Sequence, residues 1–230
     1  MMTVHQEFSI LGFDTATRGC SVALWRGGAI ASAAAKEMER GQSEALMPMI
    51  EGVLHKADKT FADLDALSVT IGPGAFTGLR IGLAAARGMA LASGLPVFGI
   101  TTLEAVAYGV GEMARKGRSI LIALDSKRAD HYVQVFSEDL IAQTEPQALL
   151  PEQLAQIVPA GPVLIAGDAA DSAANALKQE GIEFDLSDAS GLPDAKIIAA
   201  RAAARWYSGE RPDTMPLPLY LRAPDVSRPR

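Results

Sequence analysis

Apolar residues recur along the chain in short runs that predict strands, and in longer stretches spaced every third or fourth position that predict helices. The first half predicts three strands followed by a helix, a strand, a helix and a strand. In that order, the segments are 8–13, 20–25, 29–36, 43–56, 67–72, 78–93 and 96–100. Ser43 is expected to cap the first helix, and the adjacent Gly27 and Gly28 predict a tight hairpin between the second and third strands.

The second half predicts much the same order of elements again. After a linking helix at 102–115, strands are expected at 119–124, 131–136, 140–145, 162–167 and 182–186, and helices at 151–158, 171–180 and 194–207. Asp14 and Asp125 each end a strand, and aliphatic residues follow both at the eighth and tenth positions. The recurrence predicts a duplicated α/β unit, in which each half forms a mixed sheet covered by helices.

Composition places the chain among folded proteins that do not enter membranes. Of 230 residues, 49% are hydrophobic and 21% are charged, which is ordinary for a globular domain. No apolar run reaches the ~18 residues of a membrane span. The N-terminus lacks the pattern of a signal peptide and Cys20 is the single cysteine, so we expect a cytoplasmic protein. The net charge of −6 argues against unaided nucleic-acid binding but leaves room for a local basic patch.

The glycine-rich stretch GPGAFTGLR, Gly72–Arg80, raises the question of a phosphate-binding loop. It lacks the lysine and hydroxyl residue of a Walker A loop, and Thr77 stands where the dinucleotide motif needs its third glycine. We expect instead that Gly74 adopts a positive φ angle and that Thr77 caps the next helix. Small residues recur along one side of that helix, at Gly78, Gly82, Ala86 and Ala90. This stripe favours close packing of the helix.

Both helices of the first half carry apolar residues on more than one side. Between residues 78 and 93 only Arg80 and Arg87 are charged, so another helix or another subunit should cover the outer side. In the helix before it, Met47 and Met49 project away from a core line of Leu46, Ile50 and Val53. These methionines are either an adaptable contact surface or further core. Pro48 should kink or restart this helix.

Motifs for metal or nucleophilic chemistry are absent from the sequence. His5, His55 and His131 share no ligand spacing, and there is neither a C-x-x-C nor a G-x-S-x-G motif. The two turns that follow Asp14 and Asp125 are stronger candidates, because the hairpins of a duplicated fold can face one cleft. The candidate nucleotide-site residues are Asp14, Thr15, Asp125 and Ser126. In the alternative interpretation, these acids simply cap their turns.

Six stretches of the chain together resemble the TsaB family, also called YeaZ: ILGFDTATRGCSVALW, QSEALMPMI, TIGPGAFTGLRIGLAAARGMAL, ITTLEAVA, IALDSKRADHYVQVF and PLYLR. The likeness covers nearly the whole chain and is strongest over residues 8–105. It implies the two-lobed α/β fold of actin, Hsp70 and sugar kinases, built from duplicated β-β-β-α-β-α units. Residues 1–101 would form the first lobe and residues 102–230 the second, with the last ~15 residues packing back on the first lobe.

The resemblance implies a non-catalytic subunit that needs no cofactor and pairs with TsaD. TsaD holds the metal and transfers threonylcarbamoyl to adenosine 37 of tRNAs that read codons beginning with A. TsaE, an ATPase, joins the pair, and tRNA is reached only through this complex. The sequence leaves the oligomeric state of the chain alone open, with a homodimer as one alternative. The family interface maps to the two helices of the first lobe, with contacts expected at Gln42, Ser43, Met47, Met49, Leu54, Arg80, Leu83, Ala86 and Arg87.

The chain departs from the family pattern at three places. Gln42 stands where histidine is common, Ala129 and Asp130 stand where Gly-Glu is usual, and Ala169 replaces a glycine. The last two departures weaken the case for a nucleotide in the cleft. The alternative function is an ATP-dependent small-molecule kinase of the same fold. Such an enzyme should show glycine in both hairpin turns, a catalytic acid in the cleft and measurable ATP turnover.

Overall fold

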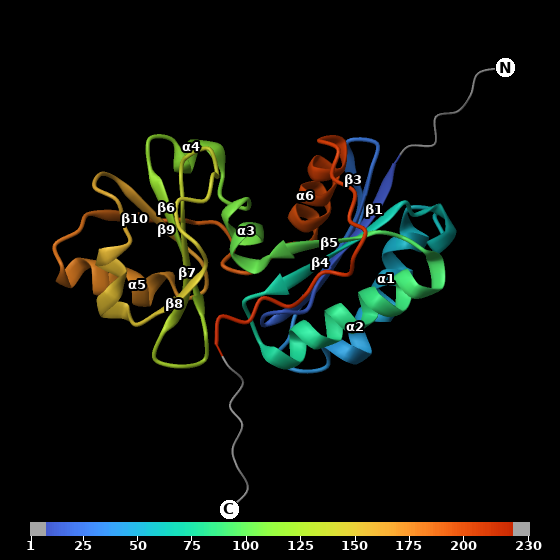
Figure 1. Ribbon diagram of the computed structural model, residues 1–230, viewed down its shortest axis with the longest axis horizontal. Coiled ribbons are helices and arrows are strands. Elements are labelled where there is room, and N and C mark those ends of the chain that lie inside the picture. Colours follow the sequence, from blue (N-terminus) through green and yellow to red (C-terminus); the bar gives the residue numbers. More distant parts are fainter. Residues whose placement is uncertain (1–7, 223–230) are drawn as a thin grey trace, which may run out of the picture.

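Two five-stranded sheets, each covered by helices on both faces, form the two lobes of the molecule (Figure 1). The computed structural model describes residues 8–222. The first sheet contains β1 (Ser9–Asp14), β2 (Gly19–Arg26), β3 (Ala29–Glu37), β4 (Ala66–Gly72) and β5 (Val97–Thr101). The second contains β6 (Ser119–Asp125), β7 (His131–Phe136), β8 (Gln147–Leu149), β9 (Val163–Ala166) and β10 (Phe184–Leu186).

The two sheets have the same topology, which confirms the predicted duplication. The first runs β3-β2-β1-β4-β5 and the second, read from its other edge, runs β8-β7-β6-β9-β10. In both, the first three strands are antiparallel neighbours, and the first strand pairs in parallel with the fourth. Asp14 and Asp125 end the equivalent strands β1 and β6, and positive φ angles at Gly27 and Gly28 form the predicted hairpin.

Helices cover each sheet on both faces. On the first sheet, α1 (Gln42–Lys56) and α2 (Phe76–Ser93) lie on one face and α6 (Ala195–Tyr207) on the other. On the second, α5 (Ala170–Gln179) and the 3₁₀ helix η2 (Pro151–Gln156) cover one face, and α3 (Thr102–Ala107) covers the other. A further 3₁₀ turn, η1 (Phe61–Asp63), precedes β4, and the short α4 (Glu112–Arg115) precedes β6.

The helix α6 belongs to the first lobe, which corrects the predicted boundary at residue 102. Its small residues lie directly on β1, where a Cβ added to Gly12 would stand 2.8 Å from the Cβ of Ala199. The Ser21 hydroxyl oxygen also accepts a hydrogen bond of 3.1 Å from the Ala195 N–H. The helix α3 follows the last strand of the first sheet, and its apolar residues pack on β6 of the second lobe. The helix that ends each repeated unit, α3 in the first and α6 in the second, therefore packs on the sheet of the other lobe. We call these two the closing helices, which the lobes exchange.

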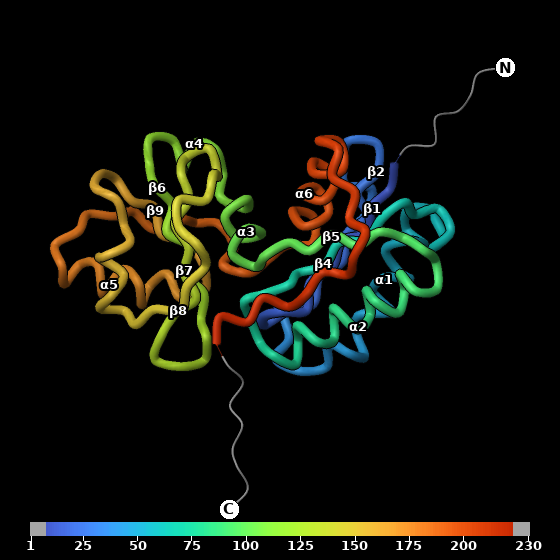
Figure 2. Tube along the Cα trace, in the orientation of Figure 1, coloured from blue at the N-terminus to red at the C-terminus, as the bar shows by residue number. Residues whose placement is uncertain are grey.

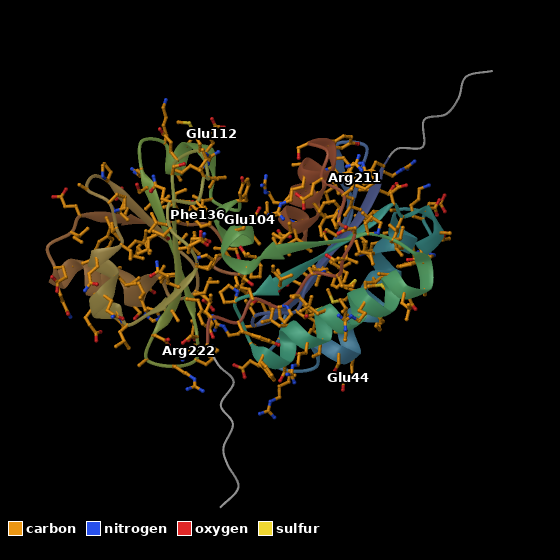
Figure 3. The ribbon with its side chains drawn as sticks, in the orientation of Figure 1. Glu44, Glu104, Glu112, Phe136, Arg211 and Arg222 are labelled. Carbon is orange, nitrogen blue, oxygen red and sulfur yellow. The ribbon has the colours of Figure 1, made fainter. Side chains whose placement is uncertain are left out.

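An ion-pair cluster joins the two exchanged helices. Glu104 of α3 accepts hydrogen bonds from Arg201 at 3.0 Å and from Arg205 at 2.6 Å, both on α6. Arg201 also lies 3.7 Å above the ring of Tyr108. Figure 3 shows Glu104 at the junction between the lobes. Partly buried guanidinium–carboxylate pairs of this kind are stronger than exposed ones, so the cluster fixes α3 and α6 together.

Several predicted boundaries differ from the structure. The linking helix is interrupted between α3 and α4, and the expected third strand at 140–145 lies instead at β8. The helix α1 begins at Gln42 after Gly41 rather than at a Ser43 cap, and it continues through Pro48 without restarting.

The glycine-rich stretch also differs in detail. The helix α2 begins at Phe76 with Ala75 as its N-cap, so Thr77 is not the cap. The positive φ angle belongs to Gly72 (108°), whereas Gly74 is needed for space. A Cβ added to Gly74 would stand 2.4 Å from the Ala16 carbonyl oxygen. The small-residue stripe of α2 faces its own sheet, since a Cβ added to Gly82 would stand 3.2 Å from a methyl group of Val69 on β4.

Gly78→Ala tests this close approach. A Cβ at Gly78 would stand 2.0 Å from the Thr15 carbonyl oxygen, so the helix must shift and the free energy of unfolding should fall by about 1–3 kcal/mol or more. Gly88→Ala is the matched control on the same helix, because no atom lies within 4 Å of its added Cβ. It should stabilise the protein by up to about 1 kcal/mol. Urea unfolding of both variants measures the difference, and equal effects would contradict the packing argument.

Candidate functional site

A cleft of about 1090 Å³ separates the two lobes. Both lobes and the C-terminal segment contribute to its wall. The lining residues are 16–18, 39–43, 73–78, Ile81, 124–128, Tyr132, Asp168 and 219–222. This volume lies at the upper end of the range for small-molecule pockets.

The two candidate residues of the first aspartate turn lie behind the cleft wall, although residues 16–18 line it. Asp14 is buried, and its Oδ1 accepts hydrogen bonds from the Thr70 hydroxyl at 2.5 Å and the Ala16 N–H at 3.0 Å. Burial raises the pKa of Asp14 to about 6, against the hydrogen bonds that lower it. The Thr15 hydroxyl donates to the Gly78 carbonyl at 2.7 Å. Neither Asp14 nor Thr15 lines the cleft, so these two candidates instead anchor the start of α2.

The second aspartate turn lies on the cleft wall, as predicted for Asp125 and Ser126. Both Asp125 oxygens are occupied by Lys127, whose N–H and Nζ each lie 2.7 Å from one of them. Partial burial raises the pKa of Asp125, but the bonds from Lys127 outweigh burial and hold that pKa below its usual range. The Ser126 hydroxyl lies 2.7 Å from an Asp130 carboxylate oxygen. These side chains cap their own turn, which agrees with the alternative interpretation of the sequence.

An ion pair crosses the cleft between Arg18 and Asp168, whose nearest atoms are 3.8 Å apart. Asp168 also accepts a hydrogen bond of 2.8 Å from the Asp125 N–H. Burial raises the pKa of the Asp168 carboxyl group. Five basic residues that meet on this wall were not predicted from the sequence. They are Arg18, Arg40, Lys127, Arg128 and Arg222. Arg18, Lys127 and Arg128 lie next to the aspartate turns in the sequence, so these three could have been predicted to line the cleft. Arg40 and Arg222 lie far from both turns in the sequence and gave no such signal.

The C-terminal segment bridges the two lobes beside the cleft. Figure 2 shows it running from α6 along the first lobe towards the second. The Leu219 N–H donates to the Ile71 carbonyl at 2.7 Å, and the ring centroids of Tyr220 and Phe76 are 5.4 Å apart. Arg222 then forms an ion pair with Asp130 of the second lobe. The described part of the C-terminal segment, up to Arg222, therefore contacts both lobes.

The outer sides of α1 and α2 form an open face. Four of the expected contact residues are exposed there: Ser43, Met47, Arg80 and Arg87. Met49 and Leu83 are half-buried against the core of the first lobe. Three are buried within the chain and correct the expectation: Gln42, Leu54 and Ala86. Leu54 and Ala86 belong to the core, while the Gln42 amide donates to the Met38 carbonyl at 3.2 Å and also lines the cleft.

Two exposed apolar residues of the open face were missed from the sequence. Phe76 and Leu91 are 41% and 87% exposed, and their spacing places them on the same side of α2 as Arg80 and Arg87. The Arg80 guanidinium lies 3.6 Å above the Phe76 ring. Figure 3 shows Glu44 on the outer side of α1. We define the open face by its exposed residues: Ser43, Glu44, Met47, Phe76, Arg80, Arg87 and Leu91.

Residues 8–222 carry neither a metal-ligand cluster nor a helix that could span a membrane. In this range no group of three or more His, Cys, Asp or Glu side chains could hold a metal ion. His5 lies outside the described residues. No helix in the same range is both long and apolar enough to cross a membrane.

Comparisons with known proteins connect the chain to one family. The family model for TsaD, tRNA N6-adenosine threonylcarbamoyltransferase, matches residues 31–192. The tRNA threonylcarbamoyladenosine biosynthesis protein TsaB of Escherichia coli is 36% identical over 130 residues, 56% of this chain and 55% of the relative. The chain thus spans about half the length of the curated TsaB relatives it matches.

Two further proteins are similar over nearly the whole chain. An uncharacterised protein of Mycobacterium tuberculosis is 30% identical over 228 residues, 98% of this chain and 97% of the relative. The structure of YeaZ from Pseudomonas aeruginosa superposes with a TM-score of 0.79 at 26% identity, and covers 93% of this chain and 100% of that one. Together with the duplicated sheets, these findings confirm the predicted actin-like fold class.

Asp14→Asn tests the buried carboxyl group. Because the folded pKa of about 6 exceeds the usual aspartate pKa of 3.8, the folded state binds more protons between about pH 4 and pH 6. The contribution of Asp14 to stability therefore falls as pH rises through this window, by about 3 kcal/mol in all. Asparagine does not titrate, so the stability of the variant should not show this decline with rising pH. Its side-chain oxygen can still accept hydrogen bonds from Thr70 and Ala16, so the fold should be kept.

Urea unfolding at several pH values measures the difference between wild type and variant. Asp171→Asn, at an exposed position on α5, is the control for simple loss of a negative charge. Parallel pH profiles for wild type and Asp14→Asn would contradict the raised pKa of Asp14.

Proposed function

The chain belongs to the TsaD family and, within it, to the TsaB (YeaZ) group, and from this membership we propose that it acts in the synthesis of threonylcarbamoyladenosine in tRNA. In this proposal it is a non-catalytic subunit that forms a heterodimer with TsaD. It supports transfer of the threonylcarbamoyl group to N6 of adenosine 37 in tRNAs that read codons beginning with A. TsaE joins the heterodimer, and the chain contacts tRNA only through this complex.

The open face of α1 and α2 is the observation that carries this proposal. It combines the exposed apolar side chains of Met47, Phe76 and Leu91 with the guanidinium groups of Arg80 and Arg87. Methionine, aromatic residues and arginine are enriched at protein interfaces. The inner sides of both helices are already packed on the first sheet, so the helices can offer this face to a partner without rearrangement of the core.

The aspartates of the two turns, together with Asp168, support an accessory role over the kinase alternative. Asp14 is buried against Thr70, Asp125 is held by Lys127, and Asp168 is held by Arg18 and the Asp125 N–H. A catalytic base needs a carboxylate that can reach the substrate hydroxyl, and each of these three is engaged within the chain. Steady ATP turnover by the purified chain in the presence of sugars would favour the kinase instead.

Depletion of the chain from cells should lower threonylcarbamoyladenosine in the tRNAs that carry it, because TsaD would lose its partner. Nucleoside analysis of bulk tRNA measures the modification. Re-expression of the wild-type chain should restore it, and TsaD should be identified when the tagged chain is purified from cells. Normal modification after full depletion would reject the proposed function.

Met47→Glu tests the open face. Met47 is 44% exposed, so the change should alter the stability of the chain alone by only about 0.5 kcal/mol. If TsaD buries this position, an unpaired carboxylate is desolvated at a cost of several kcal/mol. Affinity should then fall by about two orders of magnitude or more.

Met113→Glu is the matched control, because Met113 is 83% exposed on α4 of the second lobe. Calorimetric titration with TsaD and the melting temperature of each variant separate the outcomes. Equal affinities for wild type and Met47→Glu would remove this helix face from the interface.

A further inference from the structure

The C-terminal segment, residues 208–222, follows α6 and runs along the first lobe (Figure 2). It approaches the first sheet closely, because a Cβ added to Gly99 of β5 would stand 2.8 Å from the Cβ of Pro216. The Leu219 N–H donates to the Ile71 carbonyl on β4 at 2.7 Å. The segment therefore lies beside β4 and β5 before it reaches the cleft.

The C-terminal segment also contacts the open face. The ring centroids of Tyr220 and Phe76 are 5.4 Å apart, and the Arg80 guanidinium lies 3.6 Å from the centroid of the Phe76 ring. Phe76 and Arg80 belong to the open face, and Tyr220 is 41% exposed beside them. The segment thus extends the open face by one aromatic ring.

Two residues further on, the segment reaches the second lobe. Arg222, labelled in Figure 3, forms an ion pair with Asp130. Asp130 is only 5% exposed, and its other carboxylate oxygen accepts a hydrogen bond of 2.7 Å from the Ser126 hydroxyl. A second ion pair crosses the cleft from Arg18 to Asp168, but Arg18 is 52% exposed and the nearest atoms are 3.8 Å apart. Exposed pairs contribute little, so the pair of Arg222 is the firmer tie.

Between its two ends the segment is held by few contacts. Residues 212–222 form neither helix nor strand, and one backbone hydrogen bond, from Leu219, joins them to the first lobe. The side chain of Leu217 is 74% exposed. Segments with few buried contacts open locally at a low cost in free energy. A single contact, such as that of Tyr220 with Phe76, can therefore shift the segment between docked and undocked states.

We infer that the C-terminal segment is a mechanical link between the open face and the second lobe. While Tyr220 is docked on Phe76, Arg222 is in place to hold Asp130, and the second lobe keeps one position relative to the first. A partner that covers Phe76 and Tyr220 stabilises the docked state, and it thereby fixes a lobe that it need not touch. The identity of this partner as TsaD rests on the proposed function, whereas the link itself does not.

The distance between two spin labels, one on each lobe, measures the link in the isolated full-length chain. Lys36 on β3 and Lys178 on α5 are exposed positions for introduced cysteines. The native Cys20 is only 1% exposed, so it stays unlabelled in the folded chain. Wild type should give one narrow distance distribution in pulsed electron paramagnetic resonance.

Arg222→Gln removes the tie to the second lobe, so this variant should lose the narrow distribution. Arg211→Gln is its matched control in the same segment. The contacts of Arg211 are with Trp206 and Glu210, far from the second lobe in the chain. This control should keep the distribution of wild type.

Phe76→Ala tests whether the open face takes part. Phe76 lies on α2 and contacts Tyr220, so its loss should undock the segment and broaden the distribution although the Arg222 side chain is intact. Leu91→Ala is the matched control, because Leu91 is 87% exposed on the same side of α2, about four helical turns away. It should leave the distribution narrow.

The melting temperature of each variant shows whether both lobes stay folded. If Phe76→Ala melts early, Tyr220→Ala removes the same contact from the other side and carries the test. A narrow distribution in a folded variant that lacks this contact would overturn the inference, even if Arg222→Gln is broad. Equal broadening by Leu91→Ala would also overturn it, because any change on α2 would then loosen the lobes.

Saturating TsaD separates the link from the proposed function. If TsaD does not bind wild type, the proposed function fails, and the distances in the isolated chain still decide the link. If TsaD binds, wild type should keep its narrow distribution in the complex, and Arg222→Gln should stay broad because its link is cut. A narrow distribution for Arg222→Gln in the complex would overturn the inference, since TsaD would then hold the second lobe without the segment.

Discussion

The close contact between the first turn of α2 and the β1–β2 turn fixes the geometry on which the rest of the site depends. The Thr15 hydroxyl donates to the Gly78 carbonyl at 2.7 Å, and the Ala75 N–H donates to the Ala16 carbonyl at 2.7 Å. Glycine at positions 74 and 78 makes this approach sterically possible. The contact directs the start of α2 into the cleft and leaves its other side exposed. One backbone junction therefore positions both the cleft wall and the open face.

The elements with strong burial patterns could be predicted from the sequence, because alternation and helical spacing report local burial directly. Strands β1, β2, β6 and β7 and helices α1 and α2 are of this kind. The half-buried β8 has only three residues, so its pattern could not be separated from that of a loop. The placement of α6 depends on Ala199 meeting Gly12, a contact between distant residues that no local pattern encodes.

The candidate site was predicted in part for the same reason. The repeat indicated two equivalent turns, and the structure confirms that equivalence, but only Asp125 and Ser126 reach the cleft. Asp14 and Thr15 are buried because α2 packs directly over their turn. The equivalent helix α5 meets the second turn through Asp168, which accepts a hydrogen bond from the Asp125 N–H, and Asp125 and Ser126 stay on the cleft wall. The basic side chains of the cleft are scattered along the chain at exposed positions. Surface charges have no periodicity, so only the folded structure brings them together.

The exchange of closing helices between the lobes has a consequence for how the chain folds during synthesis. One face of the first sheet, including Ile10, Trp25 and Phe98, is covered by the alanines of α6. The ribosome must therefore complete residue 207 before this face can be sealed. The second lobe takes its cover from α3 and α5, both made earlier. The lobe that is encoded first is thus finished last, which reverses the usual order for domains that emerge from the ribosome.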